Sequence, residues 1–196
     1  SNVSDSNIVP TITSTWEQIG DAFYGTDSND TIGSNISLSS DGLVVAFKKG
    51  STVEVYEKIN ENWTQKGSTI DLVSTIQRIN ISVDGTKLFA IFHSRLAVDK
   101  GANTRLLEYT MSTPFDLTTI SLVTSGGIEL EDETQNPNGL VFSPDGTRLW
   151  TLDHQNNSAD VTQISLNVAY STNSFTIDGT VDIEDLNGID SFDEPR

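Results

Sequence analysis

The sequence predicts an all-β fold: a β-propeller or propeller segment of about three four-stranded blades. Three blades are too few to close a ring, so an incomplete ring is expected. Three observations predict the fold. A polar turn lies between two apolar runs at three places, a strand of alternating polarity follows each copy, and no credible helix interrupts the repeat of roughly 45 to 60 residues. The copies are LSSDGLVVAF (38–47), ISVDGTKLFAIF (81–92) and FSPDGTRLW (142–150).

Each copy turns at an Asp-Gly pair. A two-residue hairpin turn needs positive φ at its centre, which Gly adopts freely and Asp adopts better than most residues. A Ser shortly before each Asp is able to hydrogen-bond the backbone of the turn. We therefore predict two strands joined by a tight turn around each of the structural turn residues Asp41 and Gly42, Asp84 and Gly85, and Asp145 and Gly146.

In each copy, the strand directly after the turn differs in pattern from the next strand along the chain. VVAF, KLFAIF and RLWTL are nearly continuous in apolar character, which is typical of a strand covered on both faces. The next strands, TVEVYEKI (52–59), TRLLEYTM (104–111) and DVTQISL (160–166), alternate with a period near two. The pattern predicts a blade with a buried middle and a half-exposed outer strand.

Two later segments also repeat. Phe115 in STPFDLTTISL aligns with Tyr170 in NVAYSTNSFTI, and GIELED (127–132) aligns with TVDIED (180–185). Both alignments lie after the alternating strand, where a fourth strand is expected in a propeller blade.

These repeats divide the chain into an N-terminal extension, 1–15, and a region of propeller repeats, 16–196. The approximate units are 16–62, 63–115 and 116–170, with 171–196 entering a further unit. Closed propellers use about 4 to 8 blades, so three blades leave two faces uncovered. We expect the chain to be part of a longer polypeptide; completion of the ring by a second copy is the alternative.

Composition excludes several classes of function. Lys and Arg total 11 against 28 Asp and Glu, and the formal net charge of −17 is opposite in sign to what nucleic acids or anionic lipids attract. The longest apolar run, LVVAF (43–47), is far shorter than the roughly 20 residues of a membrane span. There is no Cys for disulfides or thiolate metal sites. We expect no nucleic-acid partner, no membrane insertion, and an extracellular or virion-surface location.

FSPDGTRLW and YTMSTPFDLTTISL resemble the tandem SPDG β-propeller repeats of large surface proteins of marine bacteria and of structural proteins of their phages. The resemblance covers residues 79–196. The N-terminal elements WEQIG, ISLSSDG and VYEK are similar to a sister repeat. The resemblance implies a scaffold or adhesion role, and it supplies no catalytic residue with a counterpart in this chain.

Acidic residues gather in the two aligned segments, which raises the possibility of calcium as a cofactor. Clustered carboxylates are the ligands that calcium needs. SFTIDGTVDIED (174–185) fits part of a calcium loop, although Ser174 and Thr176 stand where acids are expected. An alternating strand with its acids facing water explains the same residues. The possible ligands are Glu131, Asp132, Asp178, Asp182, Glu184 and Asp185.

No motif predicts catalysis. His93 and His154 each follow the Asp of their turn by nine residues, and matched positions in adjacent blades lie too far apart to share one metal ion. No GxSxG, HExxH or phosphate-binding Gly loop is present. We predict that the chain is not an enzyme and that it has no catalytic or cofactor-binding residues.

The three tryptophans, Trp16, Trp63 and Trp150, are typical either of sugar stacking or of core packing. Core packing is favoured, because Trp16 and Trp63 hold equivalent places in WEQIG and WTQKG, and Trp150 lies on a strand predicted to be buried.

The predicted function is a non-catalytic structural or adhesion module of a virion (tail, fibre or decoration) or of a bacterial surface. The alternatives are a carbohydrate- or protein-binding propeller module and a propeller-type hydrolase. The expected partner is a protein or further blades of the same polypeptide, and a surface glycan is a further candidate.

Overall fold

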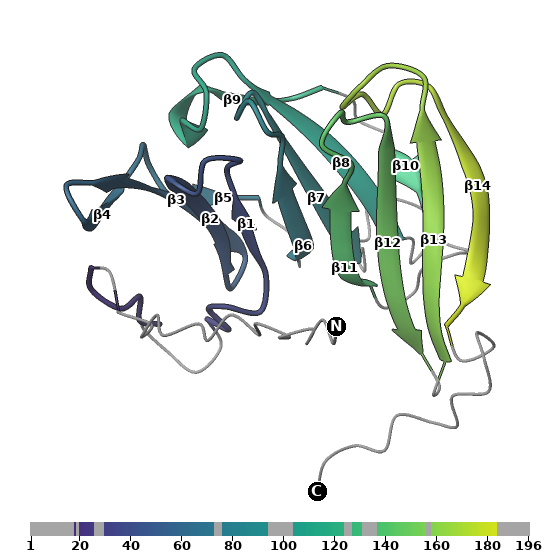
Figure 1. The fold of residues 1–196 in the computed structure, drawn as a ribbon, viewed down its shortest axis with the longest axis horizontal. Helices are drawn as coiled ribbons and strands as arrows, with labels where there is room; N and C mark the ends of the chain where they lie inside the picture. Colours follow the sequence, from purple (N-terminus) through teal and green to yellow (C-terminus); the bar gives the residue numbers. More distant parts are fainter. Residues whose placement is uncertain are drawn as a thin grey trace, which may run out of the picture.

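The computed structural model describes residues 18, 20–25, 30–72, 76–93, 104–123, 127–130, 137–155 and 158–183. These residues form three antiparallel sheets that follow one another in chain order, from purple through teal to yellow (Figure 1). The first strands of the sheets, β1, β6 and β11, are the neighbours that join one sheet to the next. The predicted all-β class is confirmed.

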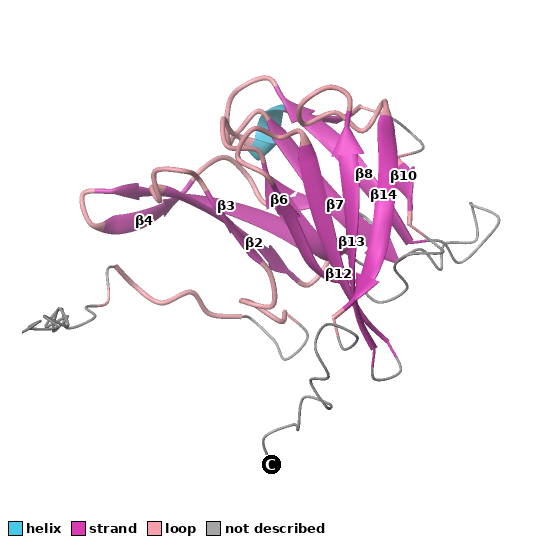
Figure 2. Cartoon of the chain, turned by 45° about the vertical axis from the view of Figure 1, so that its right-hand side comes forward, coloured by secondary structure: helices cyan, strands magenta, loops and turns pink. Residues whose placement is uncertain are grey.

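Sheet 1 has the strand order β1-β2-β3-β4, and a short strand, β5, also pairs with β3. Its strands are β1 (Ile36–Leu38), β2 (Val44–Lys49), β3 (Thr52–Ile59), β4 (Asn62–Gln65) and β5 (Ile70–Asp71). The fourth position of the sheet is therefore divided between two short strands. The hairpin of β3 and β4 extends beyond the other strands (Figure 2).

Sheet 2 has the order β6-β7-β8-β10, and β9 also pairs with β8. Its elements are β6 (Ile76–Ile81), β7 (Lys87–His93), β8 (Thr104–Met111), η1 (Leu117–Thr119), β9 (Ile120–Leu122) and β10 (Ile128–Glu129). The single turn η1 is the one helical element of the described residues (Figure 2). Asp116 caps it, because its side chain accepts the backbone N–H of Thr118.

Sheet 3 has four strands in the order β11-β12-β13-β14. They are β11 (Pro137–Phe142), β12 (Arg148–Gln155), β13 (Ser158–Leu166) and β14 (Phe175–Asp182). The long β14 takes the place that β9 and β10 share in sheet 2. Ile128 pairs with Leu106, and Val181 pairs with Val161 at the aligned position. The strand pairing agrees with the predicted alignment of GIELED with TVDIED.

The sheet boundaries differ from the predicted repeat units. Sheet 1 continues to Asp71 rather than ending at residue 62, and residues 175–182 complete sheet 3 instead of entering a further unit. A sequence repeat has a period but no natural starting point, so only the strand pairing defines where each sheet begins.

Two apolar clusters fill the spaces between the sheets, and β7 contributes to both. Leu88, Ala90 and Phe92 pack in the cluster between sheets 1 and 2. Phe89 and Ile91 point the other way, into the cluster between sheets 2 and 3. Successive side chains of a strand point to opposite faces, so an uninterrupted apolar run is what a strand buried on both faces requires. The prediction for KLFAIF is confirmed.

The Asp-Gly turns are wider than predicted. In each turn the Gly N–H donates to the carbonyl of the Ser three residues before it, at distances of 3.0, 2.9 and 2.8 Å for Gly42, Gly85 and Gly146. Only the Gly has positive φ, at 72°, 71° and 69°, and the Asp does not. The predicted two-residue turn is therefore wrong. A four-residue turn that ends in a left-handed Gly reverses the chain equally well, because the Gly restores the twist of the hairpin.

Candidate functional site

The carboxylates of the three turns bind their own backbone. Asp145 Oδ1 accepts from Ser143 Oγ (2.5 Å), from the Thr147 N–H (3.1 Å) and from Thr147 Oγ1 (2.9 Å). These hydrogen bonds favour the ionised form and lower the pKa of Asp145 to about 2. Asp41 and Asp84 make the same bonds to the Ser two residues before them and to the backbone N–H two residues after them. All three Asp-Gly pairs thus have a structural role, because each one holds the backbone of its turn.

The other two turn carboxylates also have lowered pKa values. Hydrogen bonds from Ser39 and from the Leu43 N–H lower the pKa of Asp41. Burial alone raises the pKa of Asp84, and the hydrogen bonds from Ser82 and Thr86 outweigh it. The chain is therefore expected to lose turn stability in acid.

Asp145→Asn tests this effect through its pH dependence. The pKa of Asp145 is lowered on folding, so its contribution to stability is present above the ordinary pKa of 3.8 and is lost as the pH falls towards about 2. We expect the melting temperature of the variant to lie below that of the wild type at about pH 6, and the difference to close near pH 2. Asp21→Asn, which changes an exposed residue outside the turns, is the control. A difference that does not change with pH would contradict the assignment.

Aromatic rings cover two of the three turns. Phe115 and Tyr170 have positive φ, 61° and 54°, and their N–H groups donate to the carbonyls of Gly85 and Gly146, both at 2.8 Å. A Cβ on either Gly would overlap the ring above it. The predicted alignment of Phe115 with Tyr170 thus describes a real equivalence. Gly42 has nothing within 4 Å of a Cβ position, so the turn of sheet 1 lacks this cover.

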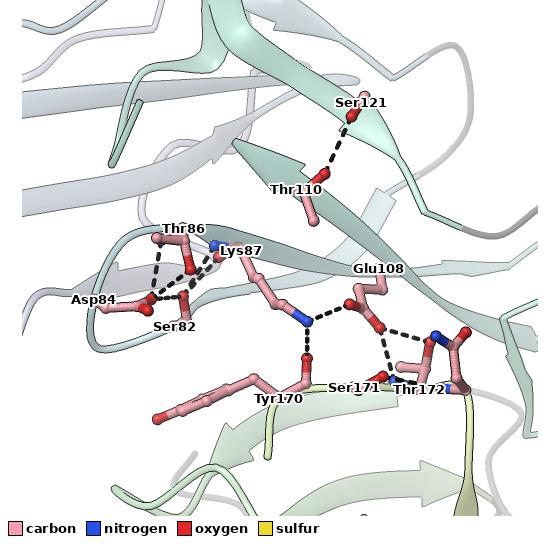
Figure 3. A network of polar contacts seen from close by, with 11 residues as sticks. Ser82, Asp84, Thr86, Lys87, Glu108, Thr110, Ser121, Tyr170, Ser171 and Thr172 are labelled. Atoms are coloured by element: carbon pink, nitrogen blue, oxygen red, sulfur yellow. Dashed lines mark hydrogen bonds and ion pairs between the residues drawn. The ribbon is translucent and has the colours of Figure 1, made fainter. Parts of the chain in front are cut away.

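A buried glutamate connects sheet 2 with sheet 3 (Figure 3). Glu108, on β8, is only 1% exposed. Its Oε1 lies 2.6 Å from Lys87 Nζ, and its Oε2 accepts the Thr172 N–H (2.7 Å) and Thr172 Oγ1 (3.0 Å). Lys87 Nζ also donates to the carbonyl of Tyr170 at 2.6 Å. We call these four residues the glutamate network.

The same positions are apolar between sheets 1 and 2. Val55 pairs with Ala46 as Glu108 pairs with Phe89, and Leu117 follows Phe115 by two residues as Thr172 follows Tyr170. The counterparts of Lys87, Glu108 and Thr172 are Val44, Val55 and Leu117, and all three are buried in the first cluster. The two interfaces thus share one geometry and differ in chemistry.

The possible calcium ligands are only partly within the described residues. Glu131, Asp132, Glu184 and Asp185 lie outside them. Asp178 occupies a bulge of β14 and accepts hydrogen bonds from Gln163 Nε2 and Ser165 Oγ, both at 2.7 Å. These bonds lower its pKa. Asp182 pairs in register with Asp160.

Within the described ranges, no group of three or more His, Asp or Glu residues is arranged to hold a metal ion. The calcium site stays a prediction. His93 ends β7 and His154 lies on β12, paired with Thr104 and Ala159 respectively.

The two described tryptophans, Trp63 and Trp150, do not pack in the two clusters. Trp16 lies outside the described residues. Trp63 lies on β4 and contacts Phe23, with the ring centroids 6.4 Å apart. Trp150 is half-buried on β12, and its Nε1 donates to Gln163 Oε1 at 3.1 Å. The prediction of core packing is wrong for both described tryptophans, because each lies on the outward face of the first or the last sheet.

The outward face of sheet 3 carries an apolar surface, which we call the third-sheet face. It consists of Val141, Trp150, Leu152, Val161 and Val181. The strand register places these side chains in two adjacent rows, with Val141 beside Trp150 in one row and Leu152, Val161 and Val181 side by side in the other. Val141 is 54% exposed and Val181 is 49% exposed.

Four of these residues have counterparts in sheet 2 that are completely buried. Trp150, Leu152, Val161 and Val181 correspond to Phe89, Ile91, Leu106 and Ile128, because the two sets share the same spacing from their turns and the same strand pairing. All four counterparts are 0% exposed, since sheet 3 covers them. The third-sheet face thus repeats the surface by which sheet 2 binds sheet 3.

The outward face of sheet 1 is partly covered by the chain itself. Phe23 packs on Phe47 and Tyr56, with ring centroids 4.9 and 4.6 Å apart, and Phe47 is buried as a result. Ile36 and Leu38 on the innermost strand stay exposed. Their counterparts in sheet 2, which pack against sheet 1, are buried.

Sequence reasoning missed both the third-sheet face and the glutamate network. The signal for the face was available in the alternating apolar positions of 148–152 and 160–166, but the strand was predicted to be covered on both faces. A signal for the network was Glu108, the single Glu in TRLLEYTM. The strand pairing places it at the position that Val55 of TVEVYEKI holds in sheet 1.

Solved structures with a similar fold are β-propeller proteins, so the described sheets are a propeller segment. A Bacteroides fragilis protein assigned as a 6-phosphogluconolactonase is 15% identical with a TM-score of 0.51, and the match covers 75% of this chain and 38% of that chain. Saccharomyces cerevisiae Sqt1 is 10% identical with a TM-score of 0.51, and the match covers 84% of this chain and 39% of that chain. This chain therefore spans less than half of either protein. These identities show the fold alone.

No protein-family model matches the chain, and no curated protein matches it. In the part of the chain that the structure describes, no helix is long and apolar enough to cross a membrane.

Proposed function

We propose that the chain is a non-catalytic β-propeller module with a structural or adhesion role in a virion or on a bacterial surface. In this function the third-sheet face packs against a further sheet of the same repeat, which belongs to the same polypeptide.

The observation that carries this proposal is the match between the third-sheet face and the buried face of sheet 2. Sheet 2 uses Phe89, Ile91 and Leu106 to bind a following sheet, and sheet 3 presents Trp150, Leu152 and Val161 in the same arrangement. Burying an apolar side chain of this size contributes roughly 1.5 to 3 kcal/mol. A surface of this kind favours an occupant with the same repeat over an unrelated one, because spacing and strand direction already match.

The buried charges support a non-catalytic role. Glu108 is the most buried carboxylate of the described residues, and both of its oxygens bind groups that join two sheets. The three turn carboxylates bind their own backbone. Carboxylates used in this way are held in place and are not available for proton transfer to a substrate.

Hydroxyl-radical footprinting of the natural polypeptide, purified from its source in native form, tests the proposal against the isolated 196-residue chain. We expect modification of Trp150 to fall at least fivefold in the native form, because the further sheet covers it. Met111, which is 3% exposed between sheets 1 and 2, is the internal control and should be protected in both samples. We also expect a mass well above 21.3 kDa under denaturing conditions.

Equal modification of Trp150 in the two samples would overturn the proposal. Protection of Trp150 with a denaturing mass of 21.3 kDa would assign the face to a second copy and contradict the proposed occupant.

A further inference from the structure

The third-sheet face has a polar border on the side of the turn of sheet 3. Arg148 pairs in register with Ser165, and Trp150 pairs with Gln163. Leu149, between Arg148 and Trp150, points into the cluster between sheets 2 and 3, so these four side chains lie on the outward face. Polar and apolar residues thus share the surface that a following sheet would meet.

Hydrogen bonds hold the polar border in one arrangement. Gln163 Oε1 accepts from Trp150 Nε1 at 3.1 Å, and Gln163 Nε2 donates to Asp178 Oδ2 at 2.7 Å. Ser165 Oγ donates to the same oxygen of Asp178, also at 2.7 Å. The carboxylate of Asp178 is therefore fixed in place and is still exposed. Side chains that are already ordered lose little freedom on binding, which favours association.

The polar border occupies the positions of the glutamate network in the preceding sheet. Arg148 takes the place of Lys87, because each lies two residues after the Gly of its turn. Gln163 takes the place of Glu108, because each pairs with the aromatic residue of the strand that follows the turn. The carboxylate comes instead from Asp178, one hydrogen bond beyond the Gln163 amide. Sheets 2 and 3 thus each present one cation and one carboxylate towards the following sheet.

Between sheets 2 and 3, the cation and the carboxylate hold a loop of sheet 3 (Figure 3). Lys87 Nζ donates to the carbonyl of Tyr170, and Glu108 accepts both the N–H and the hydroxyl of Thr172. Between sheets 1 and 2, where valines replace the charged pair, the same loop position is Leu117. We call this position, two residues after the ring that covers the turn, the loop residue. Its chemistry matches the face that it meets.

Sheet 1 has no loop residue to offer. Its strand β3 ends at Ile59 and β4 begins at Asn62, so only Asn60 and Glu61 join them. A second copy that placed its sheet 1 on the third-sheet face would cover Asp178 without a partner for the carboxylate. A further sheet that has the loop of sheets 2 and 3 fits the polar border better.

We infer that the third-sheet face selects a following sheet whose loop residue is Ser or Thr. Asp178 accepts the N–H and the hydroxyl of this residue, and Arg148 donates to the carbonyl of the aromatic residue two positions before it. The inference rests on the proposed function and names the chemistry of the sheet that this function requires. Leucine as the loop residue would bury a cation and a carboxylate without hydrogen-bond partners, which is strongly unfavourable.

Tandem mass spectrometry of the natural polypeptide tests the inference through the peptides that follow Arg196. The segments PFDL (114–117) and AYST (169–172) identify the loop residue by alignment, and we expect Ser or Thr at their fourth position in the following sheet. Any other residue there, in a polypeptide of larger mass, would overturn the inference and leave the proposed function standing. A denaturing mass of 21.3 kDa would overturn both.

Hydroxyl-radical footprinting of variants measures whether the polar border holds the following sheet. In the natural polypeptide, Asp178→Ala should raise modification of Trp150 by roughly threefold or more, because the lost hydrogen bonds involve a charged group. The same substitution in the isolated 196-residue chain measures its local effect on Trp150 through Gln163. Glu61→Ala, which removes a surface carboxylate that pairs with Lys58, is the matched control and should leave Trp150 protected.

The outcomes of the footprinting separate the inference from the proposed function. Wild-type protection of Trp150 that persists in Asp178→Ala would overturn the inference alone, as would an equal rise in the isolated chain. A wild-type polypeptide in which Trp150 is not protected would overturn the proposed function and, with it, the inference.

Discussion

Replacing Gly146 with alanine is expected to destabilise the chain by about 3 kcal/mol. The left-handed conformation, with φ of 69°, costs an L-residue with a Cβ about 1 to 2 kcal/mol. The new methyl group would also overlap the ring of Tyr170, so the ring must leave its place over the turn. For a domain of this size, such a loss lowers the melting temperature by roughly 6 to 12 °C. Thermal unfolding followed by circular dichroism measures it.

Gly42→Ala is the matched control for this prediction. Gly42 has nearly the same φ, 72°, in the equivalent turn, but nothing lies within 4 Å of its Cβ position. We expect only the backbone cost, about 1 to 2 kcal/mol. The difference between the two variants isolates the contact with Tyr170. Equal destabilisation by both substitutions would show that the ring contact contributes nothing.

Replacing Glu108 with leucine is expected to destabilise the chain by about 3 to 5 kcal/mol. The substitution leaves Lys87 without its carboxylate and the Thr172 N–H without its acceptor, between two packed sheets. Breaking a buried ion pair costs more than the pair contributes, because the remaining charge stays desolvated. Denaturant unfolding measures the loss. Glu57→Leu breaks the more exposed pair with Lys66, and its cost should stay below about 1 kcal/mol.

The interface between sheets 1 and 2 provides the rescue for this variant. It holds Val44, Val55 and Leu117 where the glutamate network holds Lys87, Glu108 and Thr172. The triple variant Lys87→Val, Glu108→Val, Thr172→Leu is therefore expected to recover most of the stability, to within about 1 kcal/mol of the wild type. A triple variant as unstable as Glu108→Leu would contradict the equivalence of the two interfaces.

The different chemistry of the two interfaces suggests a reason for the network. Because the three sheets share one repeated geometry, a sheet is able to pack against the wrong neighbour. An apolar contact does not distinguish the right neighbouring sheet from the wrong one. A glutamate that needs both Lys87 and Thr172 accepts only sheet 3 as its neighbour, whereas the apolar set accepts only another apolar set. We therefore propose that the network specifies the order of the sheets more than it adds to stability.

Much of the fold was predictable because the repeat is written in local patterns. The positions of the three turns, the strands after them and the alternating strands 52–59 and 104–111 follow from side-chain period and turn chemistry, which a sequence displays directly. Even the equivalence of Phe115 with Tyr170 was visible from spacing. The turn type was not, since a four-residue turn and a two-residue turn both place Asp-Gly between apolar runs.

The site features were not predictable, because they depend on what lies across an interface. RLWTL and KLFAIF were both predicted to be covered on both faces, yet Phe89 is 0% exposed and Val141, beside Trp150, is 54% exposed. Sheet 3 covers the face of β7 that carries Phe89, whereas none of the described residues covers the outward face of β12. Likewise, Glu108 and Thr172 are 64 residues apart in sequence and form their hydrogen bond only when sheets 2 and 3 pack.

The sequence by itself determined the class of fold, the number of repeats and the residues that form each turn, because periodicity and turn propensity act within a few residues. Only the tertiary structure decided which apolar strand is covered and which glutamate is buried. Burial and charge pairing are set by the packing of one sheet on the next, and that packing joins residues from separate repeats.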